Sequence, residues 1–180
     1  MNILTKLSLL LLFISQSLIA QQSAVYTDSN QDYNKAVQLY KENQFQASQI
    51  LFDKVKSTAT SEEILSDCDY YIANCAIKTN QSGADALMEA FIENHPTSTK
   101  RNSAYLEVAQ YYFAEGNYTQ SLKWYENIHE PDLSASDFEK ANFQRGYANF
   151  SIKNNKDASK YLNKVANSKE YGNQAKYYLG

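Results

Sequence analysis

Apolar and small residues recur at intervals of three and four positions through residues 102–129. A spacing of this kind places side chains on one face of an α-helix. Residues 115–117 interrupt the pattern, and Gly116 suits the left-handed backbone that ends a helix. The pattern therefore predicts two amphipathic helices joined by a tight turn. Its members are Tyr105, Val108, Ala109 and Tyr112 before the turn, and Tyr118, Ser121, Leu122, Tyr125 and Ile128 after it.

Two such helices cannot bury their apolar faces alone, so they must stack against neighbouring pairs. The segment resembles a tetratricopeptide repeat, a helix–turn–helix unit of about 34 residues. The resemblance rests on the large residue Tyr105, the turn residue Gly116 and the aromatic Tyr118 that opens the second helix. Ser121 stands where the family prefers alanine, and Pro131 follows near the family's terminal proline. The resemblance implies an all-α fold, a right-handed α-solenoid of such repeats.

Degenerate copies of this pattern extend over residues 32–180. The second copy is the least regular, because its turn at residues 79–82 requires a one-residue slip. Arrays of repeats normally end in a polar capping helix, which we do not find before Gly180. We therefore expect the natural chain to continue beyond Gly180. The alternatives are that residues 171–180 form a short single helix or that a partner covers them. The expected repeats lie at about 29–56, 64–96, 102–131 and 139–166, with the start of a fifth at 173–180.

The N-terminal residues differ from the rest of the chain. Lys6 precedes a largely apolar run of roughly 13 residues that ends at the small residue Ala20. This pattern predicts a secretory signal peptide over residues 1–20, and residues 21–31 follow as a polar leader; an uncleaved N-terminal anchor is the alternative. We therefore expect an exported protein, periplasmic or associated with the cell envelope. Residues 91–104 also resemble junctions in exported bacterial envelope proteins such as BamD and YbgF, a local likeness that transfers no function.

Composition and charge exclude some classes of partner. The chain has only five glycines and two prolines, which favours helices over a sheet-rich fold. Its net charge of −3 and the lack of a basic run argue against nucleic acid. We expect no integral membrane span once the signal peptide is removed.

The two cysteines are not expected to form a disulfide. Cys68 and Cys75 lie about 10 Å apart along one predicted helix, so we expect buried thiols rather than a disulfide.

The sequence shows few residues suited to catalysis. His95 and His129 are the only histidines, and each stands at the end of a second helix in its repeat. A Gly-rich phosphate loop, a GxSxG elbow and an HExxH motif are all missing. We therefore expect no enzymatic activity, no cofactor and no metal site.

The resemblance also implies which residues face a ligand, because the first helix of each repeat in this family lines a concave groove. Large rigid aromatic side chains bind peptides at low entropic cost and also stack on sugars. The alternative is that these residues only pack between adjacent repeats. The expected groove residues are Tyr33, Val37 and Tyr40, then Leu106, Gln110 and Phe113, then Phe143, Tyr147 and Phe150, and finally Tyr177, with Tyr70 or Tyr71 and Lys78 from the second repeat.

These expectations favour a protein–protein interaction scaffold or adaptor in the cell envelope, with a peptide or protein segment held in the aromatic groove. Contact with an outer-membrane complex is part of this interpretation. Two alternatives stay open. One is a module that binds glycan or peptidoglycan in the same groove. The other is the repeat region of a longer protein whose activity lies after residue 180.

Overall fold

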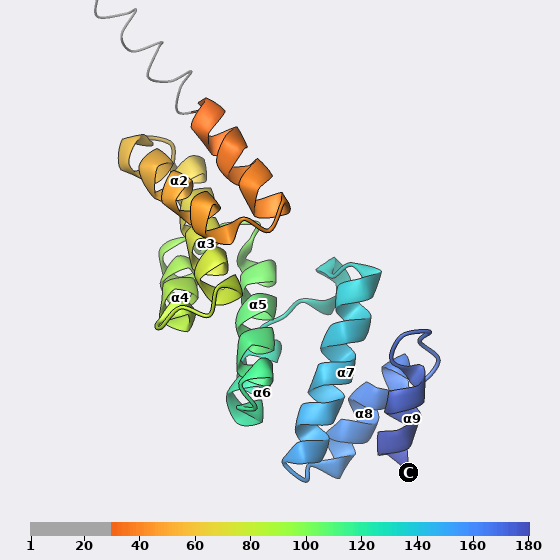
Figure 1. Cartoon of the computed structure of the whole chain (residues 1–180). Helices are drawn as coiled ribbons and strands as arrows, with labels where there is room; N and C mark the ends of the chain where they lie inside the picture. Colours follow the sequence, from red (N-terminus) through yellow and green to blue (C-terminus); the bar gives the residue numbers. More distant parts are fainter. Residues whose placement is uncertain (1–29) are drawn as a thin grey trace, which may run out of the picture. The chain divides into compact units, whose positions relative to one another are not determined.

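The computed structural model describes residues 30–180, which form helices and, within that range, no β-strand. The all-α prediction is confirmed for these residues. The predicted signal peptide, residues 1–20, lies outside the described residues, as does most of the predicted leader. In chain order the elements are a helix over 30–41, α2 (Phe45–Thr58), α3 (Glu62–Lys78), α4 (Ala84–Asn94), α5 (Arg101–Ala114), α6 (Tyr118–Tyr125), the 3₁₀ turn η1 (Glu130–Asp132), α7 (Ala135–Ser151), α8 (Asn155–Val165) and α9 (Gly172–Leu179) (Figure 1).

The described residues divide into two compact units, with the boundary between Cys68 and Asp69. In the first unit, the helix over 30–41 packs against α2. The rings of Tyr33 and Phe52 pack edge to face, and their centroids lie 5.8 Å apart. The Ser48 hydroxyl donates a hydrogen bond of 2.9 Å to the carbonyl oxygen of Ala36. Ala36, Ser48 and Phe52 are fully buried, so this contact forms the core of the helix pair.

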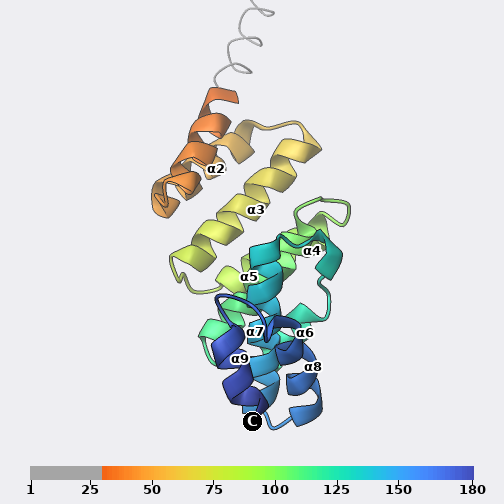
Figure 2. The same ribbon diagram turned by 90° about the vertical axis from the view of Figure 1, so that its right-hand side faces the viewer.

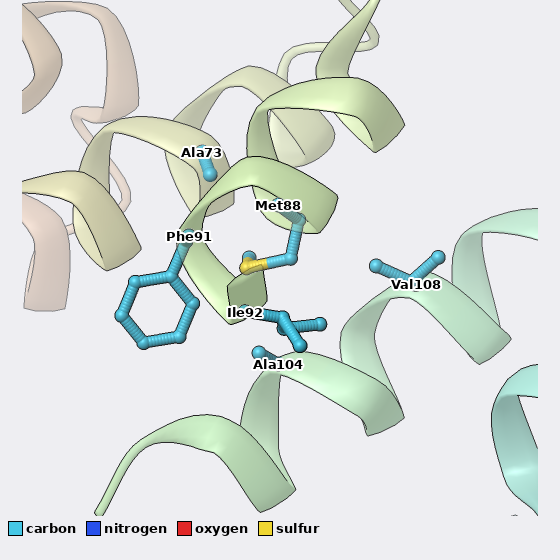
Figure 3. Packing of buried hydrophobic residues seen from close by; sticks show 6 residues of the cluster. All are labelled: Ala73, Met88, Phe91, Ile92, Ala104 and Val108. Atoms are coloured by element: carbon cyan, nitrogen blue, oxygen red, sulfur yellow. The ribbon is translucent and has the colours of Figure 1, made fainter. Parts of the chain in front are cut away.

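The core at the start of the second unit lies between α3, α4 and α5. Side chains from one face of α4 fill it, and small residues of the neighbouring helices allow the backbones to approach (Figure 3). Met88 and Phe91 are almost completely buried, and Ala73 and Ala104 are fully buried. Because apolar area removed from water drives folding, this cluster holds the three helices together. The cluster comprises Ala73, Met88, Phe91, Ile92, Ala104 and Val108.

The C-terminal part of the second unit continues the same packing. The helices α7, α8 and α9 lie side by side in both views (Figures 1 and 2), and α7 also contacts α5 and α6. Among residues 30–180, Tyr125 is the largest fully buried side chain, and it packs with Leu106, Ala109 and Ala141. A second set, Ala158, Leu162, Val165 and Ala175, holds α8 against α9. No helix among the described residues has both the length and the apolar character needed to span a membrane.

Helix pairs in both units are closed by the same kind of contact. The Ser121 hydroxyl donates 2.8 Å to the carbonyl oxygen of Ala109, just as Ser48 does to Ala36. Each serine lies twelve residues after its partner and is fully buried. The hydrogen bond satisfies the buried hydroxyl, which explains why serine is tolerated where the family prefers alanine.

A left-handed residue recurs in the turn of each helix pair. The φ angles are +60° at Asn43, +53° at Asn80, +73° at Gly116 and +64° at Lys153. The prediction for Gly116 is thus confirmed. Glycine and asparagine adopt this conformation readily, whereas a lysine there is strained.

Replacing the strained turn residue should stabilise the protein. We expect Lys153→Gly to raise the free energy of unfolding by up to about 1 kcal/mol, because relief of left-handed strain exceeds the added chain entropy. Gly116→Ala, the matched opposite change, should lower it by about 1 kcal/mol. Urea unfolding followed by the fluorescence of Trp124 measures both. A lowered midpoint for Lys153→Gly would contradict this account.

The connector between α6 and α7 is fixed by polar contacts. The helix α6 ends at Tyr125, before Ile128, so it is shorter than the sequence pattern indicates. The Asn102 side chain accepts a hydrogen bond of 2.8 Å from the His129 backbone N–H and donates to its carbonyl oxygen. Glu130 then ion-pairs with Arg145 of α7 at 2.5 Å and with Lys164 of α8 at 2.6 Å. These contacts hold the connector in place, although it contains no α-helix and only the short 3₁₀ turn η1.

This ion-pair network predicts a pH dependence of stability. Burial alone would raise the pKa of Glu130, but the hydrogen bond and charge of Lys164 and the charge of Arg145 outweigh it, so the pKa lies below its usual value. A carboxyl whose pKa is lowered by folding stabilises the protein above its unfolded pKa, and the contribution is lost as pH falls through the folded pKa.

Glu130→Gln should therefore be less stable than the wild type at neutral pH, and the difference should shrink as the pH falls below about 4. Thermal unfolding at a series of pH values measures it. A difference that does not change with pH would show that the ion pairs contribute nothing to stability.

Candidate functional site: an aromatic groove on α5, α6, α7 and α9

An open groove of about 680 Å³ lies on the second unit. It is formed by the end of α5, the start of α6, the middle of α7 and the helix α9. Aromatic rings form most of its wall, and two carboxamide side chains complete it. We call this surface the aromatic groove. The residues that line it are Phe113, Ala114, Tyr118, Phe143, Tyr147, Asn173, Gln174, Tyr177 and Tyr178.

The rings of the aromatic groove contact one another in a continuous series. Tyr147 lies at its centre, with ring centroids 5.8 Å from Phe113, 5.7 Å from Tyr118 and 5.1 Å from Tyr178. Tyr177 extends the series at 5.2 Å from Tyr178. Contacts of this kind restrain the rings of Phe113, Tyr118, Tyr147 and Tyr178, so this part of the groove presents a preformed surface, and the exposed ring of Tyr177 extends it.

Local sequence explains how the rings converge. Phe113 ends α5 and Tyr118 begins α6, so the turn through Gly116 brings their centroids to 5.5 Å. Phe143 and Tyr147 lie four residues apart on α7 and share one helical face. On α9 the same spacing pairs Asn173 with Tyr177 and Gln174 with Tyr178. The helix α9 therefore supplies four of the eight polar and aromatic residues that line the groove.

Close backbone contact brings α9 to this position. Gly172 begins the helix, and a Cβ atom there would meet the carbonyl oxygen of Ala166 at 2.9 Å. Ala175 is fully buried against α8. The Tyr171 ring stacks on Phe143 with centroids 5.0 Å apart, directly behind the groove wall. Burial and the neighbouring carboxylates of Glu170 and Glu139 raise the pKa of Tyr171 to about 12, so it stays neutral at physiological pH.

Two tyrosines of the groove differ from many of those in the packed interior in the hydrogen bonds of their hydroxyl groups. Outside the groove, six tyrosine hydroxyls have hydrogen-bond partners within the fold: Tyr33 with Asp67, Tyr70 with Asn74, Tyr105 with Arg101, Tyr112 with Asp85, Tyr125 with Gln144 and Tyr161 with Arg145. In the groove, neither Tyr177 nor Tyr178 forms a hydrogen bond through its hydroxyl within the described part of the chain. The side chains of Asn173 and Gln174 likewise have none among residues 30–180. These four polar groups are available to a ligand.

The aromatic groove carries no charged residue among the residues that line it. Burial and a hydrogen bond with Tyr147 raise the pKa of the Tyr118 phenol, so this tyrosine is also neutral. Ligand binding here must rest on ring stacking, apolar burial and neutral hydrogen bonds. An ionic ligand would find no opposite charge in the groove wall.

Of the residues that the sequence places at a groove, the structure brings together four: Phe113, Phe143, Tyr147 and Tyr177. Phe150 lies at the edge, with its ring 5.1 Å from Tyr178 and 42% of its surface exposed. The others lie elsewhere.

Gln110 accepts a hydrogen bond of 2.7 Å from Lys140 between α5 and α7. Leu106 is only 7% exposed and packs in the core with Tyr125, so its side chain does not face a groove. Tyr33 and Tyr40 lie in the first unit, where their rings pack against Phe52 and Phe45.

The residues of the second repeat form a separate surface. Tyr70 is largely buried beside Phe91, and this burial raises the pKa of its phenol. Lys100 lies over the rings of Tyr70 and Tyr71, at 5.9 and 5.5 Å from their centroids. Lys78 pairs with Glu107 at 2.8 Å. None of these residues lines the aromatic groove.

Sequence reasoning missed Tyr118, Tyr178, Asn173 and Gln174. Tyr118 opens the second helix of its repeat, whereas the family resemblance places only first-helix residues at the groove. Tyr178 directly follows a predicted groove residue, but the pattern gives no reason for two successive residues to face one cavity. The four-residue spacing on α9 was a usable signal for Asn173, because it lies one turn before Tyr177.

Both histidines contact carboxylates outside the groove. His95 meets Asp69 at 2.9 Å, and His129 meets Asp132 at 3.0 Å. The first pair joins the loop after α4 to α3, which is a structural role. Among residues 30–180, no group of three His, Cys, Asp or Glu side chains is arranged to hold a metal ion. Cys68 and Cys75 are both buried and form no disulfide with each other.

Comparisons with known proteins agree with this architecture. Residues 67–98, which form most of α3 and all of α4, match the family model of the tetratricopeptide repeat. This segment is therefore similar to a tetratricopeptide repeat. The matched segment is the copy that looked least regular in the sequence, not residues 102–129. A search of curated proteins finds no match.

The fold is also found in a solved structure. The chain is similar to nearly identical TPR-like repeats from a Podosopora anserina protein assigned as a kinesin light chain, with a TM-score of 0.60 and 15% sequence identity. The match covers 83% of this chain and 82% of the other. The fold is therefore that of a TPR-like repeat solenoid. The likeness of residues 91–104 to envelope proteins such as BamD and YbgF stays a prediction.

Proposed function

We propose that this chain is a non-catalytic protein–protein interaction scaffold whose aromatic groove holds a segment of a partner protein. The tetratricopeptide repeat supports the general role, because repeats of this family typically bind proteins. The observation that carries the proposal is the set of polar groups on α9 that have no partner within the described residues, beside rings that are already fixed in place. Preformed aromatic surfaces with a few neutral hydrogen-bonding groups are typical of binding sites.

We further propose that the protein is exported and acts in the cell envelope, where its partner belongs to the periplasm or to an outer-membrane complex. The support is the pattern of residues 1–20, in which Lys6 precedes a short apolar run that ends in a small residue. Expression of the full chain in a bacterial host, followed by fractionation and N-terminal sequencing, tests this. A mature protein that starts near Gln21 in the periplasmic fraction is expected. Retention of the whole chain in the cytoplasm would contradict export.

Glycan binding is the second candidate, and the carboxamides of Asn173 and Gln174 beside the exposed ring of Tyr177 favour it. Sugars are recognised by ring stacking together with neutral hydrogen bonds, which this surface offers. The acidic groups of peptidoglycan would meet no cation among the lining residues. We therefore place a protein segment first and an uncharged glycan second.

The binding proposal predicts a selective loss in groove variants. A random-peptide display library is selected on the full chain, and the affinity of recovered peptides is measured by isothermal titration calorimetry. We expect Tyr177→Ala with Asn173→Ala to weaken binding at least about 10-fold, because truncating an aromatic side chain that packs on a bound peptide typically costs about 1–2 kcal/mol or more. Both residues are exposed, so the helix should stay folded.

The matched control is Ile50→Ala, which removes an exposed apolar side chain from the first unit. It should leave affinity unchanged, and circular dichroism should show equal helix content in all three proteins. Peptides that bind the groove variant as tightly as the wild type would refute the aromatic groove as the site. Failure to recover any peptide, together with saturable binding of an oligosaccharide, would favour the glycan alternative.

A further inference from the structure

The walls of the aromatic groove restrict what kind of segment fits it. We propose that its occupant is an uncharged, proline-rich segment in the polyproline II conformation. This inference rests on the proposed function, because it names the chemistry of the partner at the same site. Three observations carry it: the lack of charge, the inclination of the rings and the hydrogen-bonding groups without partners.

The lack of charge selects against most exposed protein segments. Ordinary surface segments carry Lys, Arg, Asp and Glu, and burying such groups without an opposite charge is costly. The lining consists of aromatic, carboxamide and alanine side chains. Proline-rich segments are among the few extended sequences that are both exposed in water and free of charge over several residues.

The inclination of the rings produces notches rather than a flat platform. The ring planes meet at 67° in Phe113 and Tyr147, at 80° in Tyr147 and Tyr178, and at 80° in Tyr177 and Tyr178. The broad apolar face of a pyranose chair stacks best on an open aromatic face, whereas the compact pyrrolidine ring packs into the angle formed by two steeply inclined rings. Aromatic-lined grooves of this kind are a recognised means of binding polyproline II segments.

The spacing of the notches also suits this helix. Polyproline II has three residues per turn and rises about 3.1 Å per residue, so residues i and i+3 on one face lie about 9 Å apart. In the groove, two successive ring steps measure 5.8 Å from Phe113 to Tyr147 and 5.1 Å from Tyr147 to Tyr178. A third step of 5.2 Å leads from Tyr178 to Tyr177, so the notch of Phe113 and Tyr147 and the notch of Tyr177 and Tyr178 lie at most about 11 Å apart, a range that includes the separation of two prolines on one face.

The available donors match the acceptors of such a segment. A polyproline II backbone makes no internal hydrogen bonds, and its carbonyl oxygens point outward without donors of their own. Hydroxyl groups of Tyr177 and Tyr178 and the amide N–H groups of Asn173 and Gln174 can donate to these oxygens. A segment that supplies only acceptors is thus complementary to a wall that supplies neutral donors.

Defined probes test this inference on the full chain by isothermal titration calorimetry. The probes are decaproline with acetylated and amidated ends, a Gly-Ser decapeptide with the same ends, and chitohexaose. We expect saturable binding of decaproline, at least 10-fold weaker binding of the Gly-Ser peptide, and no saturable binding of chitohexaose. Tyr177→Ala should weaken decaproline binding at least 10-fold, and Tyr178→Phe about three-fold, because the phenyl ring remains while the hydroxyl is lost.

The outcomes separate this inference from the proposed function. If library-selected peptides bind the groove but decaproline does not, the polyproline II inference fails and the proposed function stands. If chitohexaose binds and its binding is lost in Tyr177→Ala, both fail in favour of a glycan site. Decaproline binding that is unaffected by Tyr177→Ala and by Tyr178→Phe overturns the inference as well, because the segment would then lie elsewhere.

Discussion

Phe91→Ala lowers the free energy of unfolding by about 3–5 kcal/mol, the largest effect that we expect from a single substitution. Phe91 is 1% exposed and lies between α3 and α5, with its ring 5.5 Å from that of Tyr70 (Figure 3). Removing the ring takes away its transfer free energy and leaves a cavity that Met88 and Ile92 cannot fill without moving. Because this cluster joins three helices, its loss should destabilise the whole second unit.

Urea unfolding monitored by circular dichroism and by Trp124 fluorescence measures the effect. Phe91→Leu is the matched control, since it keeps an apolar side chain of moderate size and should cost clearly less than the alanine variant. Equal stability of wild type and Phe91→Ala would mean that the cluster between α3, α4 and α5 does not hold the helices together.

Gly146→Ala destabilises the protein by about 1–2 kcal/mol, although alanine is the better helix former. A Cβ atom at this position would meet the Leu162 side chain at 2.6 and 2.7 Å and the Leu162 backbone nitrogen at 3.1 Å. Leu162 is fully buried, so α7 and α8 must separate to relieve the contact. The overpacking cost exceeds the gain of about 1 kcal/mol from helix propensity.

A double-mutant cycle with Leu162→Ala tests this explanation. Leu162→Ala alone should cost about 2–5 kcal/mol, because it opens a cavity between α7 and α8. With both changes, the cost should be smaller than the sum of the two single costs, since the new methyl group occupies part of the space that leucine leaves. Purely additive costs would show that Gly146 is not needed for the approach of these helices.

The helix pairs were predictable because the apolar pattern repeats through residues 32–180. Spacings of three and four residues predicted the helices on both sides of Gly116, and chain direction reverses at Asn43, Asn80 and Lys153 as well. The end of α6 was not predictable from this pattern. Ile128 continues the spacing, but the hydrogen bonds between Asn102 and His129 hold the chain in a connector instead.

Only some of the residues that line the aromatic groove could be predicted from the sequence. Helical spacing gives the direction in which a residue points, as for Phe143 and Tyr147, but not which neighbouring helix it meets. Leu106 lies on the same helix as Phe113, yet Tyr125 and Ala141 cover it and bury its side chain. Whether a residue of α5 is buried or lines the groove depends on how α6 and α7 pack against α5. The apolar pattern of a single helix does not contain this information.

Distinguishing a binding tyrosine from a packing tyrosine also needed the structure. In the sequence, Tyr112 and Tyr178 have similar neighbours, since each follows a tyrosine near the end of a first helix. In the structure, Tyr112 donates a hydrogen bond of 2.7 Å to Asp85, whereas the Tyr178 hydroxyl has no such bond within the described part of the chain. The partner of a hydroxyl is a tertiary contact, and periodicity contains no information about it.

The central claim is that the aromatic groove is where the partner segment binds, and site-specific photocrosslinking tests it most directly. p-Benzoylphenylalanine replaces Tyr177, which is 79% exposed at the groove, and in a separate protein it replaces Ile50, which is 72% exposed in the first unit. Each protein is irradiated with a library-selected peptide. The account predicts that the peptide crosslinks to position 177 and not to position 50. Equal crosslinking at both positions, or crosslinking at position 50 alone, would contradict it.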